Sequence, residues 1–186
     1  MIWYRDDEIT IRDLDIADAR VFTEEELRQG WHVSEEKYLE HLRHRDQGRC
    51  VPLAAEYFGE AAGYINVYRE AVEGPFAGTG WPEIVDFGVL MKYRRRGVGT
   101  ALISAAERIA AGYADTVCLA VGLHNGYGAA QRMYVKRGYI PDGSGAWYRG
   151  KNCTPYDTVY TNDDDLVLYL SKKLPGHEKT GGGDPL

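Results

Sequence analysis

EIVDFGVLMKYRRRGVGTALISAAERIAAG, residues 83–112, has the order strand, glycine turn, helix. Residues 83–90 are rich in Ile, Val and Phe with only two charges, which predicts a buried central strand. Residues 92–99 contain four basic residues and two glycines, as expected where the backbone bends sharply or approaches another group closely. From Val98 onward the apolar residues recur at helical spacing, and we expect the helix to end near Gly112.

The start of this predicted helix is a candidate anion site. A helix N-terminus presents unpaired N–H groups and the positive end of the helix dipole, and phosphate binds there. Gly97 and Gly99 have no Cβ to keep a diphosphate away from these amides. Three successive arginines, Arg94, Arg95 and Arg96, add permanent positive charge. On glycine spacing alone, an ordinary helix start with a solvated basic run explains the pattern equally well.

Two common phosphate loops do not match. The P-loop needs a Lys after its last glycine, and the dinucleotide fingerprint needs a third glycine where this chain has Leu102. The remaining pattern, Arg-x-x-Gly-x-Gly from Arg94 to Gly99, resembles the acetyl-coenzyme A loop of the GNAT superfamily, the N-acetyltransferases related to histone acetyltransferases. A second stretch, TVCLAVGLHNGYGAAQRMYVKRGYIPDG at residues 116–143, resembles the family's next strand, helix and strand, with Tyr134 at the position of its usual tyrosine.

The resemblance implies an α/β (α+β) fold with a mixed, mostly antiparallel central sheet of six to seven strands flanked by about four helices. It also implies acetyl-CoA as co-substrate, with its pyrophosphate on the loop amides. The family's usual asparagine for the pantetheine arm should fall at Tyr127, so either Asn125 makes that contact or the contact is absent. The other expected cofactor-binding residues are Val89, Leu90, Met91, Arg94, Arg95, Arg96, Gly97, Val98, Gly99 and Thr100.

The rest of the chain predicts a single domain over residues 1–174. Asp15 and Asp18 are expected to cap a helix, and Ser34 a second one; in the family these helices form a wall of the acceptor groove. The loop at residues 69–82 is long and glycine-rich, as functional loops often are. Residues 175–186 have nothing to bury, and we expect them to be disordered. The other predicted strands cover residues 9–12, 51–57, 61–68, 116–121, 139–141 and 166–171, and another helix runs from Asn125 or Gly126 to residue 137.

Composition narrows the class of protein. The chain has 186 residues, 44% of them hydrophobic, which is enough for one full core. A net charge of −6 argues against general binding to nucleic acid or to an acidic membrane surface. The three cysteines are far apart and lack metal-ligand spacing, which predicts free thiols, no metal site and a reducing compartment. With no apolar run of membrane length, we expect a cytoplasmic protein; a homodimer is left open.

Acetyl transfer to an amine requires a base, because an alkylammonium with a pKa near 10.4 must lose a proton before attack. Glu83 is the leading candidate, since it lies at the strand entry and 11 positions before Arg94, like the base glutamate of the histone-acetyltransferase branch. Asp86 is the second candidate. Strand alternation places the two carboxylates on opposite faces unless the strand is bulged, so only a bulge would let both line one groove. A solvated strand end is an equal alternative for Glu83.

Tyr134 is the candidate acid, because a phenol remains protonated at neutral pH and can donate to the departing thiolate. A core tyrosine is the alternative. A backbone N–H around Val89 or Leu90 is expected to stabilise the oxyanion. Acyl transfer through Cys118 or Cys153 is a minor alternative, because neither is paired with a histidine in the predicted order of elements.

We therefore predict an acetyl-CoA-dependent N-acetyltransferase that acts on a small-molecule or peptide amine in a ternary complex. The alternative is a non-catalytic acyl-CoA-binding regulatory module; nucleic-acid binding through the arginine run is a third and weaker interpretation. Acidic residues near the predicted groove would favour a cationic acceptor such as a polyamine or an aminoglycoside; these residues are Glu35, Glu36, Glu70 and Glu73.

Overall fold

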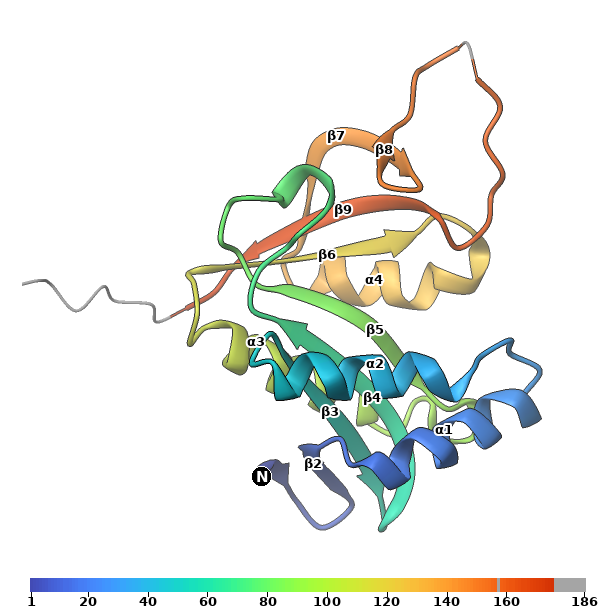
Figure 1. Cartoon of the computed structure of the whole chain (residues 1–186), viewed down its shortest axis with the longest axis vertical. Coiled ribbons are helices and arrows are strands. Elements are labelled where there is room, and N and C mark those ends of the chain that lie inside the picture. Colours follow the sequence, from blue (N-terminus) through green and yellow to red (C-terminus); the bar gives the residue numbers. More distant parts are fainter. Residues whose placement is uncertain (157, 176–186) are drawn as a thin grey trace, which may run out of the picture.

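The computed structural model describes residues 1–156 and 158–175, so the prediction of a disordered tail falls almost entirely outside the described residues. Figure 1 shows a central sheet with helices packed against it. Among the described residues, no helix has the length and apolar character needed to cross a bilayer. The helices are α1 (Ile16–Arg28), α2 (Glu35–Asp46), α3 (Val98–Ala110) and α4 (Gly128–Lys136), with short helical turns η1 (Gly74–Phe76), η2 (Met91–Tyr93) and η3 (Asn125–Tyr127). The strands are β1 (Ile2–Arg5), β2 (Ile9–Asp13), β3 (Cys50–Tyr57), β4 (Glu60–Tyr68), β5 (Glu83–Val89), β6 (Thr116–Gly122), β7 (Ile140–Tyr148), β8 (Lys151–Asn152) and β9 (Leu166–Lys173).

The described strands form one sheet of nine, in the order β1-β2-β3-β4-β5-β6-β9-β7-β8. Only β5 and β6 pair in parallel, which confirms the mixed, mostly antiparallel class. The expected count of six to seven strands was too low. β1 and β8 are short, largely exposed strands at the two edges of the sheet, and such strands have almost no buried face to produce an alternating apolar pattern.

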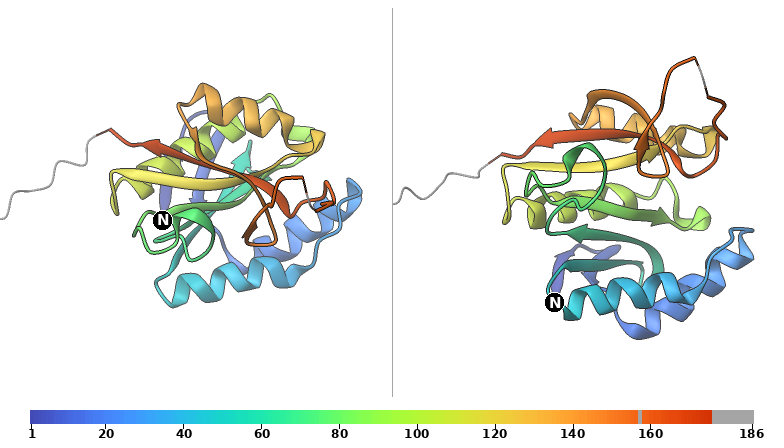
Figure 2. Two further views of the ribbon diagram at one scale, coloured as in Figure 1. Left: turned by 90° about the horizontal axis from the view of Figure 1, so that it is seen from above. Right: turned by 45° about the horizontal axis from the view of Figure 1, so that its top comes forward.

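Two helices cover each face of the sheet, as Figure 2 shows in the view from above. On the face covered by α1 and α2, here called the α1–α2 face, the core includes Phe22, Tyr38 and Tyr64. On the α3–α4 face, Leu102 and Ile65 lie in a larger core. Because Tyr64 and Ile65 are consecutive in β4, they alternate between the two cores, as strand geometry requires.

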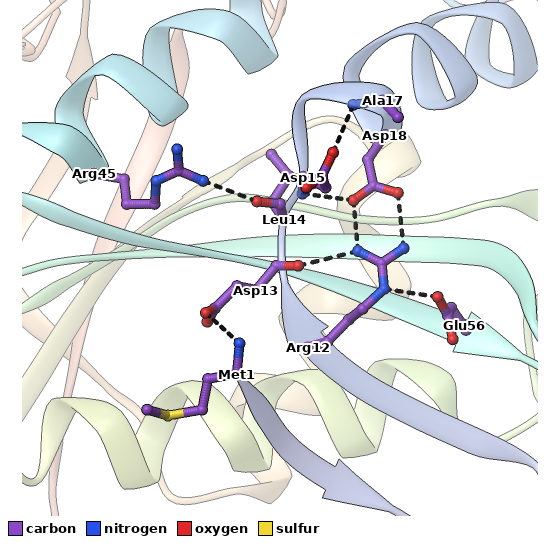
Figure 3. A network of polar contacts seen from close by, with 9 residues as sticks. All are labelled: Met1, Arg12, Asp13, Leu14, Asp15, Ala17, Asp18, Arg45 and Glu56. Carbon is purple, nitrogen blue, oxygen red and sulfur yellow. Dashed lines mark hydrogen bonds and ion pairs between the residues drawn. The ribbon is translucent and has the colours of Figure 1, made fainter.

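The start of α1 is held by the polar network of Figure 3. Asp15 accepts the amide of Ala17 and its own amide donates to Asp18, which confirms the predicted cap. Arg12 of β2 donates two hydrogen bonds to Asp18, of 2.6 and 2.8 Å, and a third of 2.6 Å to Glu56 of β3. These charge-assisted hydrogen bonds join α1 to the sheet and so fix the position of the α1 N-terminus.

Candidate active site

The central feature of the site is the separation of β5 from β6. The two strands pair only at Glu83 with Cys118 and at Ile84 with Leu119, and then diverge, as Figure 1 shows. From Val85 to the end of β5, the backbone edge that faces β6 therefore has no strand partner. Unpaired N–H and C=O groups on such an edge must find other partners, either water or a ligand, which makes the edge a candidate binding surface.

A β-bulge lies at the same place. In the pairing of β4 with β5, Asn66 faces Val85 and Tyr64 faces Gly88, so Asp86 and Phe87 together oppose one residue. Asp86 has a left-handed φ of 48°, and the buried Asn66 amide donates to the carbonyls of Val85 and Asp86. The bulge therefore shifts the alternation by one residue.

The bulge places both candidate carboxylates on the α1–α2 face. Glu83 pairs in register with Tyr68, whose hydroxyl bonds His41 of α2, and His41 in turn bonds Asp86. Phe87 lies on the opposite face, where its ring packs against Tyr134 of α4 with centroids 6.5 Å apart. Simple alternation would have separated Glu83 from Asp86, and the bulge is the reason that it does not.

Glu83 lies at the point where the strands begin to separate. Its side chain makes no hydrogen bond or ion pair with a described residue. Burial and then the negative charge of Glu73 raise the pKa of Glu83 to about 7. A carboxylate with this pKa is suited to accept a proton near neutral pH.

Asp86 has the opposite electrostatic environment. Partial burial raises its pKa, but a hydrogen bond from His41 and the positive charge of Lys37 outweigh that effect and hold the pKa below its usual value. Two carboxylates on one face thus have pKa values that are pushed apart, a pattern typical of groups with different roles. Asp86 stays ionised at neutral pH, whereas Glu83 can gain and lose a proton.

Tyr134 of α4 is buried, and 5% of its surface is exposed. Its ring packs on Phe87 and Tyr139, and its hydroxyl makes no hydrogen bond with a described residue. Burial, with a smaller contribution from Tyr127, raises the pKa of Tyr134. The phenol is therefore protonated at neutral pH and available as a donor.

The arginine and glycine loop lies at the start of α3. Gly97 caps the helix with φ 84°, a left-handed conformation that favours glycine, and Ala101 makes the first helical bond back to the Gly97 carbonyl. The amides of Val98, Gly99 and Thr100 precede that bond and have no acceptor within the helix. The backbone therefore has unpaired amides at the position of the predicted anion site, and anion binding there stays a prediction.

The side chains of the loop supply the charge. All three arginines of the loop are exposed, and none forms an ion pair with a described residue. The guanidinium carbon of Arg94 lies 5.6 Å from the centroid of the Trp31 ring. Trp31, in the connection between α1 and α2, therefore lies next to the loop. The exposed residue Met91 uses its amide to bond Gln29 of the α1 C-terminus. Guanidinium groups without ion pairs, beside unpaired amides, are the groups that polyanion sites use in proteins.

A family model described as the acetyltransferase (GNAT) family matches residues 15–139. The chain belongs to the GNAT acetyltransferase family. No curated protein matches it in sequence. Several solved acetyltransferases share its fold at low sequence identity.

One such structure is the acetyl transferase from Salmonella typhimurium that modifies the N-terminal serine of 50S ribosomal subunit protein L7/L12, with a TM-score of 0.69, 11% identity and coverage of 94% of this chain and 99% of that one. Another is the ribosomal-protein-S18-alanine N-acetyltransferase from Escherichia coli, with a TM-score of 0.65, 17% identity and coverage of 94% and 99%. A third is the putative acetyltransferase yncA from Salmonella typhimurium with its cofactor acetyl-CoA, with a TM-score of 0.65, 16% identity and coverage of 95% and 100%.

Two details of the structure bear on the oxyanion donor and on the minor alternative of a covalent intermediate. The amide of Leu90 donates to the Ala62 carbonyl at 2.9 Å, so Leu90 was wrong as an oxyanion donor, whereas Val89 remains a candidate.

Cys118 is fully buried, and burial together with the charge of Glu83 raises its pKa to about 12. A thiol with that pKa carries almost no thiolate at neutral pH, which argues against a covalent intermediate at Cys118.

Asn125 lies in η3, after β6. It is exposed and lines a surface pocket with His124 and residues 162–164. Tyr127, at the position expected for asparagine, packs its ring against Gly122 and donates a 3.0 Å hydrogen bond to Asp164. Tyr127 therefore ties η3 to the segment before β9, and a cofactor contact from Asn125 stays a prediction.

Sequence reasoning missed His41 and Asn66, both buried and both bonded to Asp86. The sequence signal that could have identified them is a polar residue inside a predicted apolar stripe or strand. His41 follows the stripe residues Tyr38 and Leu39, and Asn66 lies inside the run of residues 61–68. Their partner is 45 and 20 residues away in sequence, respectively, a contact that local pattern does not reveal.

Proposed function

We propose that this GNAT chain transfers an acetyl group from acetyl-CoA to a primary amine by direct attack in a ternary complex. The observation that carries the proposal is the gap between β5 and β6. Two carboxylates, Glu83 and Asp86, lie on its α1–α2 side, and Tyr134 lies on its α3–α4 side. The acceptor and the thioester would therefore approach the gap from opposite faces.

The coenzyme would lie on the α3–α4 side. Its pyrophosphate fits the free amides of Val98, Gly99 and Thr100, with Arg94 to Arg96 alongside. From there the pantetheine arm would follow the unpaired edge of β5 toward the gap. The solved relative with acetyl-CoA supports this choice of co-substrate, since its fold is similar.

In the reaction, the acceptor nitrogen attacks the thioester carbonyl, a C–N bond forms and the C–S bond breaks. Glu83 accepts the proton that the ammonium must lose, and Tyr134 donates the proton that the departing thiolate takes up. A backbone amide of β5 between Phe87 and Val89 would donate to the oxyanion. The nitrogen loses its second proton to solvent as the amide forms, Glu83 returns its proton to solvent, and Tyr134 regains its proton from solvent.

The acceptor class is a primary amine of a small molecule or of a peptide. Two solved relatives are described as acting on the N-terminal residue of a ribosomal protein or on a ribosomal-protein alanine, which makes a peptide α-amine the first candidate to test. The free cysteines of the described chain fit the reducing conditions of the cytoplasm, where we place the enzyme.

The test is a thiol-release assay with acetyl-CoA and a panel of amines, with product mass as a second readout. The panel contains peptides with free or blocked N-termini, polyamines and aminoglycosides. We expect thiol release that depends on a free amine, with one acetyl group added to that amine. If acetyl-CoA raises the melting temperature but no amine causes thiol release, the chain is a non-catalytic acyl-CoA-binding module instead.

Gly99→Ala tests the coenzyme site. A Cβ at Gly99 would meet Phe87 and Val89 at 3.5 Å, an ordinary contact, so the folded protein tolerates the methyl group. The methyl group would lie beside the helix amides that the coenzyme pyrophosphate must approach. We expect acetyl-CoA affinity to fall about tenfold by calorimetry with an unchanged melting temperature. Unchanged affinity would contradict the site; Gly97 is less informative because its φ of 84° would strain any replacement.

A further inference from the structure

Asp86 is held by contacts that the proposed transfer step does not use. The residue occupies the bulge with a left-handed φ of 48°, a conformation that is strained for a non-glycine residue. Oδ2 of its carboxylate lies 2.8 Å from Nε2 of His41, and the His41 side chain is only 7% exposed. Asp86 itself keeps 39% of its side chain exposed. One carboxylate oxygen is therefore anchored, and the group still reaches solvent on the α1–α2 face.

The anchor continues through a chain of hydrogen bonds. Nδ1 of His41 lies 2.8 Å from the Tyr68 hydroxyl, which also lies 2.8 Å from Nδ1 of His44. With Asp86 ionised, one arrangement satisfies every contact with neutral imidazoles. His44 donates to the Tyr68 oxygen, Tyr68 donates to Nδ1 of His41, and Nε2–H of His41 donates to Asp86. The tautomer of His41 and the direction of its ring are thereby set by β4 and α2 together.

The second oxygen, Oδ1, faces a cation that has other partners. Nζ of Lys37 lies 4.0 Å from it, but donates a 2.8 Å hydrogen bond to the Tyr64 hydroxyl. Tyr64 and Tyr38 both donate to the buried carboxylate of Glu26 at 2.6 Å. With neutral imidazoles, Glu26, Lys37 and Asp86 together carry one net negative charge. A further cation on this face would neutralise that charge.

The surroundings already stabilise a primary ammonium group. The Lys37 ammonium lies over the rings of Tyr38 and Tyr64, at 5.2 and 4.7 Å from their centroids. Both rings are buried and hold the Lys37 ammonium, so they keep this cation on the Tyr64 side of Asp86. The net negative charge of this face therefore favours a positively charged amine as the acceptor.

We propose that Asp86 anchors the ammonium group of the acceptor through its exposed oxygen and that His41 is a positioning residue that holds this carboxylate in place. The inference rests on the proposed function and deepens it by assigning different roles to the two carboxylates. Asp86 binds the cation and stays ionised, and Glu83, on the same face, removes the proton. The acceptor class is then an amine that arrives as its ammonium form.

The test measures ammonium binding without turnover. The full chain with CoA, labelled with ¹³C at aspartate carboxyl groups, is titrated with n-butylammonium and, as the neutral control, with n-butanol. We expect a saturable shift of the Asp86 carboxyl resonance with n-butylammonium only, assigned by its loss in Asp86→Asn. His41→Leu should weaken that binding about tenfold or more, because a charge-assisted hydrogen bond is lost. His41→Gln, whose amide can still donate to Oδ2, should restore most of it.

The proposal is overturned if n-butanol shifts Asp86 as n-butylammonium does, or if no saturable shift occurs. It is also overturned if a folded His41→Leu protein binds n-butylammonium as tightly as the unmodified chain. Should His41→Leu fail to fold, the Asp86→Asn protein is titrated with n-butylammonium instead, and the resonance of the Phe87 backbone amide is followed. Loss of the ammonium-dependent shift there supports the anchor, and its retention overturns it. Intact ammonium binding without acetyl transfer would refute the proposed function and leave the anchor standing.

Discussion

Glu83→Gln is expected to lower kcat/KM for the amine by about 100-fold or more, because the amide cannot accept the proton of the ammonium group. In the unmodified enzyme, kcat/KM should rise with pH and level off above about 7, since burial and the charge of Glu73 raise the pKa of Glu83 to about 7. The base acts in its deprotonated form, so the rising limb follows this ionisation. The variant should lack that limb in a pH profile of kcat/KM.

The same substitution should stabilise the protein. The folded state raises the pKa of Glu83 above its ordinary value of 4.5, so the folded chain retains a proton that the unfolded chain loses. Stability therefore falls as pH rises from about 4.5 to about 7, and glutamine removes that loss. We expect a higher melting temperature for Glu83→Gln at pH 8 but not at pH 4.

Glu73→Gln is the matched control. Its charge contributes to the raised pKa of Glu83, so its removal should move the pH limb to lower pH and leave the plateau rate unchanged. Retention of full kcat/KM and of the pH limb in Glu83→Gln would assign proton removal to another group.

Tyr134→Phe is expected to lower kcat by about 100-fold or more while acetyl-CoA affinity stays the same, because only the proton donor to the thiolate is removed. The phenylalanine ring keeps the packing on Phe87 and Tyr139, so the fold should be retained. Steady-state kinetics gives kcat, and calorimetry gives the affinity. A more acidic acyl leaving group, such as a thiophenol ester, should recover part of the lost rate, since it needs less proton donation.

Tyr139→Phe is the control for this substitution. Tyr139 lies in the same core, its ring is 5.5 Å from that of Tyr134, and its buried hydroxyl has no hydrogen-bond partner among the described residues. Loss of an unsatisfied buried hydroxyl should leave both kcat and the melting temperature unchanged or slightly raised. An undiminished kcat in Tyr134→Phe, or an equal loss in both variants, would remove Tyr134 as the acid.

Local sequence was sufficient for the features that neighbouring residues control. The strand, glycine turn and helix of residues 83–112, the cap at Asp15 and the free amides after Gly97 follow from spacing, backbone freedom and hydrogen-bond geometry within a few residues. The edge strands β1 and β8 escaped prediction because short exposed strands bury little, and burial produces the pattern that identifies a strand.

The relation between the two carboxylates required the tertiary structure. From strand alternation in the sequence, we could predict only that a bulge would bring Glu83 and Asp86 to one face. The bulge itself depends on Asn66 and on the pairing of β4 with β5. His41 lies 45 residues from Asp86, and the two meet because α2 packs on the sheet beside β4. Contacts between distant segments depend on register and packing, which local periodicity does not encode.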